Sequence, residues 1–101
     1  MNDYLVKALA FNGQVRIYAA NTTVIAQTAQ KIHDTWSNST AALGRTLTGA
    51  ALLSAAVLKK SGRLTIKIQG NGPIGAIVAD GDAFGKVKGY LHQPHVELAL
   101  N

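Results

Sequence analysis

The chain has 101 residues and a mass of 10.6 kDa, so residues 1–101 form one domain at most. Hydrophobic residues make up 48% and charged residues 15% of the chain, a balance typical of globular proteins and not of disordered ones. The chain contains no cysteine, which excludes disulfides, thiolate metal sites and cysteine nucleophiles from these residues. The net charge of +5 permits an acidic partner such as nucleic acid, although five excess charges on a small domain more often form a solvated surface.

No stretch of the sequence predicts a targeting or membrane segment. The N-terminus lacks a basic region followed by a long apolar run, and the most apolar stretch, 47–58, is too short to span a bilayer. We therefore expect a soluble, cytoplasmic protein without membrane contact. A compact monomer of this mass would bury roughly 64% of its extended-chain surface.

The first predicted elements are two strands joined by a tight turn. Residues 4–11 alternate weakly and are mostly apolar on both faces, which predicts a strand buried on both sides, with Lys7 near an end. The dipeptide at 12–13 is Asn-Gly, the strongest short signal for a hairpin, and residues 15–20 form the returning strand.

A first helix is predicted after the potential N-cap residues at 21–23. The side chains at i, i+4, i+7 and i+11 are apolar and would form one face of an amphipathic helix. These side chains are Ile25, Ala29, Ile32 and Trp36. The polar residues at 37–39 should end this helix and cap the next one.

A longer helix is expected from about Ser39 to Lys60, with Gly62 as its C-terminal cap. It is apolar and rich in small residues around most of its circumference, so it should be buried. Gly44 and Gly49 should let a neighbouring element approach closely.

Beyond residue 62 the hydrophobic period changes to two. Strands are predicted at 63–69, 74–80 and 86–92, with the Asp-Gly-Asp at 80–82 as a turn. The order β-β-α-α-β-β-β indicates an α+β fold, with a mixed or antiparallel sheet packed on the long, small-residue-rich helix.

The glycines at 70, 72 and 75 have the spacing of a dinucleotide-binding turn, but no helix is predicted to follow them. We interpret the segment as a hairpin turn, in which Pro73 fixes φ and Gly70 and Gly72 take positive φ. The Asp-Gly-Asp at 80–82 lacks the third and last ligands of a calcium loop. Two nearby histidines, His92 and His95, are only half a zinc site, so we expect no metal and no catalytic residue.

One face of the predicted sheet is basic. Cations beside a tyrosine are an arrangement that single-strand nucleic-acid binders use, although one aromatic ring is few for such a site. The sequence favours a solvated face over a nucleic-acid site here. The residues of this basic face are Arg63, Lys67, Lys86, Lys88 and Tyr90.

Three stretches of the chain resemble the N-terminal part of the 33 kDa chaperonin family, the redox-regulated heat-shock holdases of bacteria. They are YLVKALAFNGQVRIYAA at 4–20, STAALGRTLTGAALLSAAVLK at 39–59 and IQGNGPIGAIVADGDAFGKVKGYLHQP at 68–94. The resemblance covers nearly the whole chain, and its most specific parts are 41–46 and 70–80.

The resemblance implies a chaperone and not an enzyme: an ATP-independent holdase whose partners are unfolded client proteins. The family's redox switch is a C-terminal zinc site of four cysteines. This chain has no cysteine, so the resemblance implies an N-terminal piece of a longer protein, with the zinc domain absent. Such a piece is also expected to form a homodimer, by exchange of an element between two copies.

The apolar helix offers a candidate client surface, made of Leu43, Leu47, Leu53 and Leu58. We expect more apolar circumference than two neighbours could cover, and exposed apolar patches mark interaction sites. The sequence favours the alternative, in which this helix is the core helix, packed by the sheet or by parts of the full protein outside this chain.

Overall fold

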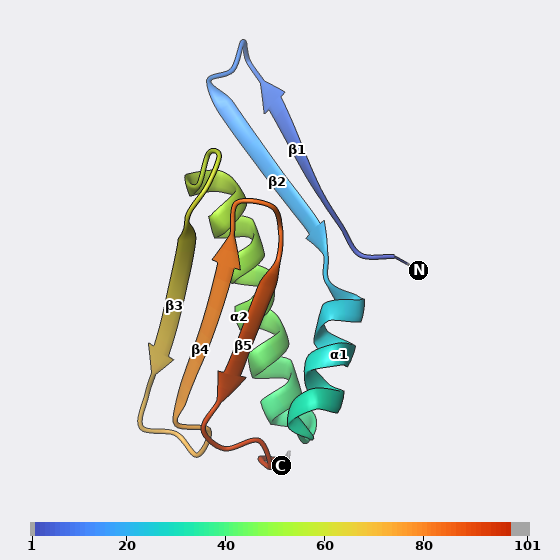
Figure 1. Ribbon diagram of the computed structural model, residues 1–101, viewed down its shortest axis with the longest axis vertical. Coiled ribbons are helices and arrows are strands. Elements are labelled where there is room, and N and C mark those ends of the chain that lie inside the picture. The colour runs from blue at the N-terminus through green and yellow to red at the C-terminus, as the bar shows by residue number, and fades with distance from the viewer. Residues whose placement is uncertain (1, 98–101) are drawn as a thin grey trace.

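The computed structural model describes residues 2–97 and confirms the α+β element order (Figure 1). β1 pairs with β2, and β3, β4 and β5 form a separate sheet in that order; both sheets are antiparallel. The elements are β1 (Tyr4–Ala10), β2 (Val15–Asn21), α1 (Thr23–His33), α2 (Ser37–Val57), β3 (Arg63–Gln69), β4 (Ala76–Asp82) and β5 (Val87–Leu91).

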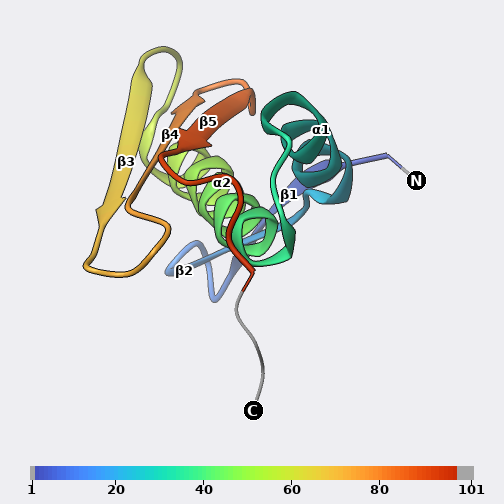
Figure 2. The same ribbon diagram turned by 90° about the horizontal axis from the view of Figure 1, so that it is seen from below.

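The core lies between α2 and the inner face of the three-stranded sheet. Figure 2 shows α2 enclosed between this sheet and the β1–β2 hairpin. α2 is long and apolar enough to cross a membrane by length and composition only, and its contacts are those of a core helix. The buried core residues are Leu43, Leu47 and Ala50 from α2 with Ile77, Ala79 and Leu91 from the sheet.

Two glycines allow α2 to lie directly on the sheet. A Cβ at Gly81 would overlap Ser54 Oγ and lie 3.0 Å from the carbonyl oxygen of Ala50, and one at Gly89 would lie 3.1 Å from Leu47 Cδ2. Gly81 therefore belongs to the buried part of β4, and the predicted turn at 80–82 is wrong. The chain turns at 83–86 instead, where Asp82 accepts backbone hydrogen bonds.

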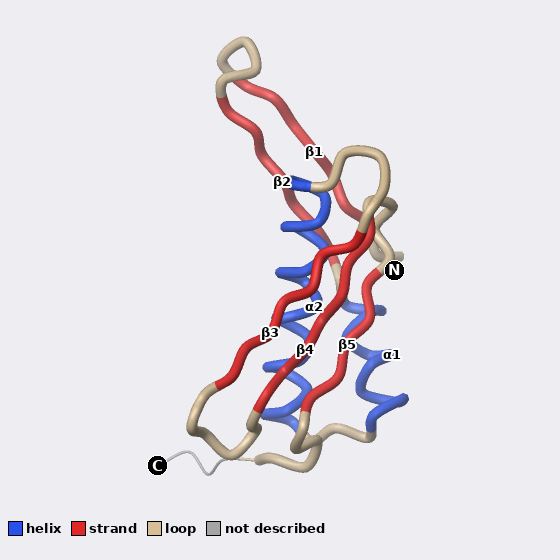
Figure 3. Tube along the Cα trace, turned by 60° about the vertical axis from the view of Figure 1, so that its left-hand side comes forward, coloured by secondary structure: helices blue, strands red, loops and turns tan. Residues whose placement is uncertain are grey.

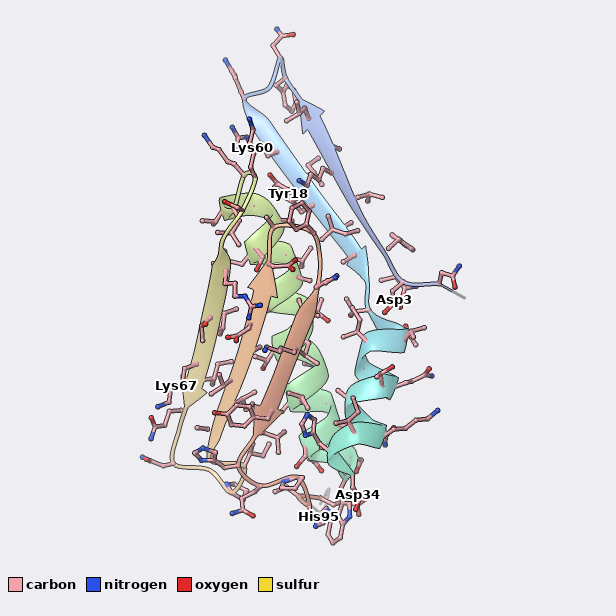
Figure 4. The ribbon with its side chains drawn as sticks, viewed as in Figure 1. Asp3, Tyr18, Asp34, Lys60, Lys67 and His95 are labelled. Atoms are coloured by element: carbon pink, nitrogen blue, oxygen red, sulfur yellow. The ribbon has the colours of Figure 1, made fainter. Side chains whose placement is uncertain are left out.

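The N-terminus of α1 is capped by Asp3, which lies 21 residues before Val24 in the sequence. Asp3 accepts hydrogen bonds from the backbone N–H groups of Val24 (2.9 Å) and Ile25 (2.8 Å), which have no partner within the helix (Figure 4). Asn21 accepts a third from Thr23. A carboxylate at this end of a helix is also favoured by the helix dipole.

α1 packs against α2 as expected at one of the two predicted glycines. A Cβ added at Gly44 would lie 3.3 Å from the Cβ of Ala26, so the absence of a side chain at Gly44 lets the two helices approach closely. A Cβ added at Gly49 would have no neighbour within 4 Å. The helix ends earlier than its apolar pattern predicts, because Asp34 takes a left-handed conformation with φ 50°. Trp36 therefore lies outside α1, and Ile32 is 70% exposed.

The first turn of α2 is held by residues from the end of the chain. Trp36 N–H donates to the carbonyl of Pro94 (2.8 Å), and Ser39 N–H donates to that of Val96 (3.4 Å). The Ser39 hydroxyl donates to Gln93 O and accepts from Val96 N–H. We call residues 93–97 the C-terminal strap. These partners let α2 begin at Ser37, two residues before the predicted start.

The two loops at the ends of β3 also differ from expectation. α2 ends at Val57, so Gly62 (φ 109°) is a loop residue and not its cap. The 70–75 segment is a hairpin turn as predicted, closed by a hydrogen bond from Gly75 N to Gly72 O. Gly75, and not Gly70 or Gly72, takes positive φ there.

The β1–β2 hairpin projects beyond the rest of the molecule (Figure 3). The turn at Phe11, Asn12 and Gly13 has positive φ at all three residues. The structure measures 47 × 27 × 26 Å and has a radius of gyration of 14.8 Å, against about 13 Å for a compact chain of this length. Its accessible surface is 7030 Å², against about 5,500 Å² for a compact monomer of this mass. The chain therefore buries less of its surface than a compact monomer would.

Candidate functional site

One face of the β1–β2 hairpin is apolar, uncharged and open to solvent. In the antiparallel register Val6 lies opposite Ala19, Ala8 opposite Ile17 and Ala10 opposite Val15, so their side chains share a face. Tyr4, Val6 and Ile17 are 56%, 51% and 50% exposed. We call this face, made of Tyr4, Val6, Ala8, Ala10, Val15, Ile17 and Ala19, the hairpin outer face.

The other face of the hairpin carries the charges and turns toward α2. Lys7 and Arg16 belong to it, and its residues Leu5, Lys7 and Ala20 line a hollow together with Ala51 and Ala55 of α2. Of the two strands, β2 makes most of the contact with α2. The hairpin outer face is thus directed away from the core.

The prediction that residues 4–11 are buried on both sides is therefore wrong for this chain. Apolar residues on both faces of β1 indicate that two layers should cover it, and the described residues supply part of one. A two-stranded hairpin is marginal on its own in water, so an exposed apolar hairpin is unusual. The sequence shows that both faces of β1 are apolar, but it does not show which segment covers them.

Two of the four residues of the predicted apolar surface of the long helix belong to the core. Leu43 and Leu47 are 1% and 2% exposed, because they fill the space between α2 and the sheet, so they offer no surface. Leu53 is 45% exposed and Leu58 is partly exposed. Leu53 and Leu58 stay candidates for partner binding, whereas the core alternative holds for Leu43 and Leu47.

The basic residues do come together on the outer face of the sheet, but not alone. Lys67 lies in register with Val78, which is opposite Tyr90, and Asp80 pairs with Lys88. The middle strand therefore places carboxylates between the cations. Arg63, Asp80, Asp82, Lys86 and Lys88 line one shallow hollow of about 180 Å³.

Both carboxylates, those of Asp80 and Asp82, accept hydrogen bonds from neighbouring residues. Asp80 accepts a hydrogen bond of 2.7 Å from the Thr65 hydroxyl. Asp82 Oδ1 accepts from the backbone N–H groups of Lys86 and Phe84, and these bonds, with the charges of Lys86 and Arg63, hold the pKa of Asp82 below its usual 3.8. The expected cationic face is thus a mixed face, which weakens the attraction for nucleic acid.

The histidines do not converge on a site. His95 stacks on Trp36 with 5.0 Å between ring centroids and lies 3.2 Å from Asp34, at the junction of the C-terminal strap with α2 (Figure 4). His92 packs beside Gly75, and His33 lies on α1. Within residues 2–97, no three His, Cys, Asp or Glu side chains are grouped as a metal site would need. The residues present do not fit the zinc that the resemblance implies.

Comparison with known proteins gives one consistent result. The family described as Hsp33 protein matches residues 3–101. The chain is 57% identical over 101 residues to the 33 kDa chaperonin of Enterococcus faecalis and 59% identical over 99 residues to that of Bacillus licheniformis. It spans about a third of the length of these curated relatives, 34% of each.

A solved structure shares the fold. The crystal structure of the 33 kDa chaperonin (heat shock protein 33 homolog) from Thermotoga maritima matches with a TM-score of 0.88 and 35% sequence identity. The match covers 96% of this chain and 33% of that one. The hairpin, the helices and the three-stranded sheet thus occur together in a larger relative. The chain belongs to the Hsp33 family.

Proposed function

We propose that this chain is the N-terminal piece of an ATP-independent holdase chaperone, which binds unfolding proteins and keeps them from aggregating during oxidative and heat stress. The observation that supports this role most directly is the hairpin outer face. Exposed contiguous apolar surface on a soluble fold marks an interaction site, and unfolding proteins expose apolar segments that it can bury. The proposed role is binding and not catalysis.

The hairpin outer face suits clients of varied sequence. It has no charged side chain to select a particular charge pattern, and it presents alanine, β-branched and tyrosine side chains. Burial of apolar surface is non-directional, so affinity depends on exposed area and not on sequence. Leu53 and Val57, 45% and 57% exposed at the end of α2, add apolar surface elsewhere on the domain.

Suppression of aggregation tests this proposal. Chemically unfolded citrate synthase would be diluted into buffer with the chain, and light scattering followed. We expect the wild-type chain to lower the scattering and Val6→Lys/Ile17→Lys to lower it several-fold less, because two charges are placed on the apolar face. Phe84→Lys is the matched control, since Phe84 is 79% exposed but lies on the β4–β5 turn.

The control variants keep the result interpretable. Val6→Thr/Ile17→Thr retains β-branched side chains at both strand positions and removes apolar surface, so it tests the same face if lysine disturbs the hairpin. Far-UV circular dichroism checks that each variant is folded. Equal suppression by the wild-type chain and both double variants, or no suppression by any of them, would contradict the proposal.

We also propose that regulation belongs to the part of the protein beyond this chain. The redox switch that the resemblance implies is a zinc site of four cysteine thiolates, and none of the 101 residues is a cysteine. The native protein, captured from its source cells with an antibody to this segment, should have a mass far above 10.6 kDa and about one zinc per chain. A native mass of 10.6 kDa without zinc would remove the switch from the proposal.

We further propose that the isolated chain forms a homodimer by exchange of the hairpin between two copies. The hairpin contacts the rest of the fold mainly through β2, and the open edge of β1 can pair with another chain. Light scattering coupled to size-exclusion chromatography would show a mass near twice 10.6 kDa, falling on dilution. A constant monomer mass at high concentration would exclude exchange.

The nucleic-acid alternative makes a distinguishable prediction. Contact of the four cations with phosphates would give a log–log salt slope of about −3 for a single strand. Apolar client binding would change little between low and high salt. Fluorescence anisotropy with labelled oligothymidine across a salt series separates the two, and we expect weak binding because Asp80 and Asp82 lie among the cations.

A further inference from the structure

Two turns of the chain carry the dipeptide Asn-Gly. Asn12-Gly13 lies in the β1–β2 turn and Asn71-Gly72 in the β3–β4 turn, at opposite ends of the molecule (Figure 1). Both asparagines are exposed to solvent. An asparagine before glycine is chemically labile, because glycine has no Cβ to hinder attack of its backbone nitrogen on the preceding side-chain amide. The two turns differ in how far they permit this attack.

The β1–β2 turn protects its asparagine. The reaction needs the nitrogen of Gly13 to lose its proton, and this N–H donates to Ala10 O at 3.1 Å. Asn12 takes the left-handed conformation with φ 56°, and a second hydrogen bond, from Gln14 N–H to Phe11 O at 3.2 Å, closes the same turn. These bonds hold the backbone in place, so the turn has to open before the nitrogen of Gly13 is free to react.

The β3–β4 turn lacks this protection. Within residues 2–97, Gly72 N–H has no hydrogen-bond partner, whereas the carbonyl of Gly72 accepts from Gly75 N–H at 3.3 Å. The backbone of Asn71 has negative φ, unlike that of Asn12. A Cβ added at Gly72 would meet nothing within 4 Å, so the space beside its nitrogen is open. This nitrogen is therefore accessible both to the Asn71 side chain and to the water that accepts its proton.

We propose that Asn71 is a site of spontaneous deamidation and that the folded chain protects Asn12 from the same reaction. The nitrogen of Gly72 loses its proton to water and attacks Asn71 Cγ. The bond from Cγ to the side-chain nitrogen then breaks and ammonia leaves, which closes a five-membered succinimide ring. Water adds to one of the two ring carbonyls and opens the ring to an aspartyl or an isoaspartyl residue. One water is consumed and one ammonia is released, and the net charge falls by one from +5.

The modified turn lies beside the start of the C-terminal strap. Ile74 O accepts from Gln93 N–H at 3.1 Å, and a Cβ at Gly75 would lie 3.2 Å from that of His92. An isoaspartyl residue adds one methylene group to the main chain of this turn and places a carboxylate on it. Its carboxylate is the group that isoaspartyl O-methyltransferases recognise and methylate, so the aged chain is a substrate for an enzyme of that class.

Ageing of the folded chain tests the assignment. The chain would be kept at pH 8 and 37 °C, and both products quantified by peptide mapping with electron-transfer fragmentation, which distinguishes aspartyl from isoaspartyl. We expect Asn71 to convert about tenfold faster than Asn12, since the hydrogen bond of Gly13 must first open. In urea the two rates should become nearly equal, because the unfolded chain protects neither site. Equal rates in the folded chain, faster conversion of Asn12, or a difference that persists in urea would overturn the proposal.

Two glycine variants test the role of the attacking nitrogen. Gly72→Ala adds a Cβ beside this nitrogen and should slow conversion of Asn71 several-fold. Gly70→Ala is the matched control, because a Cβ there also meets nothing within 4 Å and the Asn-Gly pair stays intact. It should convert at the wild-type rate. Wild-type conversion in Gly72→Ala, or equal slowing by both variants, would overturn the mechanism.

Asn71→Gln keeps the test valid if Gly72→Ala disturbs the turn. The longer side chain keeps its amide but has to close a six-membered ring, so it should lose ammonia much more slowly than Asn71 does. An isoaspartyl O-methyltransferase with a labelled methyl donor should then label aged wild type and Gly70→Ala strongly and Asn71→Gln weakly. Equal labelling of aged wild type and Asn71→Gln would overturn the assignment to Asn71.

Discussion

The close contact between α2 and β4 predicts that adding one methyl group at Gly81 lowers the free energy of unfolding by a large amount. In Gly81→Ala the new Cβ would overlap Ser54 Oγ and lie 3.0 Å from Ala50 O and 3.1 Å from Ser54 Cβ. Two of these neighbours are main chain or rigidly attached to it, so the helix itself must move. Overpacking of this kind costs about 3 kcal/mol of the free energy of unfolding. The observable is the midpoint of urea unfolding, followed by far-UV circular dichroism.

A double-mutant cycle attributes this cost to its cause. Ser54 is fully buried, and its hydroxyl has no hydrogen-bond partner among the described residues. Removing an unsatisfied buried hydroxyl is close to neutral or stabilises by about 1 kcal/mol, so Ser54→Ala alone should not destabilise. In Ser54→Ala/Gly81→Ala the worst overlap is gone, and we expect about 1–2 kcal/mol of the loss to be recovered as coupling energy.

Gly49→Ala is the control for the glycine itself. Gly49 lies within α2 and has no neighbour within 4 Å of an added Cβ. Its replacement should stabilise the chain by about 0.5–1 kcal/mol, since alanine favours a helix interior. If Gly81→Ala were tolerated as well as Gly49→Ala, or if Ser54→Ala recovered none of the loss, the account of this helix–sheet contact would be wrong.

Two further predictions concern carboxylates at chain ends and turns. Asp3→Ala should lower the free energy of unfolding by about 1–2 kcal/mol and speed amide exchange of Val24 and Ile25, because it removes the acceptors of both N–H groups. Asp3→Asn should lose less stability. Equal amide exchange in the wild type and both variants would refute the cap. The pKa of Asp82 is lowered in the folded state, so its contribution is present at neutral pH and lost as pH falls below 3.8. Melting temperatures from pH 5 to 2.5 should therefore fall less steeply in Asp82→Asn than in wild type, and parallel curves would contradict this.

The elements themselves could be predicted because each has a clear period or turn residue. Alternation predicted β3 and β5, and the Asn12-Gly13 signal predicted the first hairpin. It was harder to predict which faces of these elements are buried. The pattern of β1 is that of a strand with two covered faces, but periodicity reports apolarity and cannot say which segment supplies the cover. The hairpin outer face was missed for this reason.

Local turn rules failed where tertiary contacts override them. The Asp-Gly-Asp at 80–82 has turn chemistry, yet Gly81 is needed in β4 because α2 passes too close for a side chain. The end of α1 was misplaced because Asp34 takes the left-handed conformation that usually marks glycine or asparagine. The predicted basic residues do share one face of the sheet, but the turn chemistry of 80–82 hides the fact that Asp80 and Asp82 lie among them on β4.

The C-terminal strap has a consequence for folding during synthesis. Ser39 and Val96, which hydrogen-bond to each other, are 57 residues apart. At about 5–20 residues per second the ribosome delivers Val96 roughly 3–11 s after Ser39. Until then the first N–H groups of α2 lack the carbonyls of Pro94 and Val96, and α2 has no side-chain cap of its own. The start of the central helix is therefore among the last parts of the domain to become hydrogen-bonded as the chain emerges.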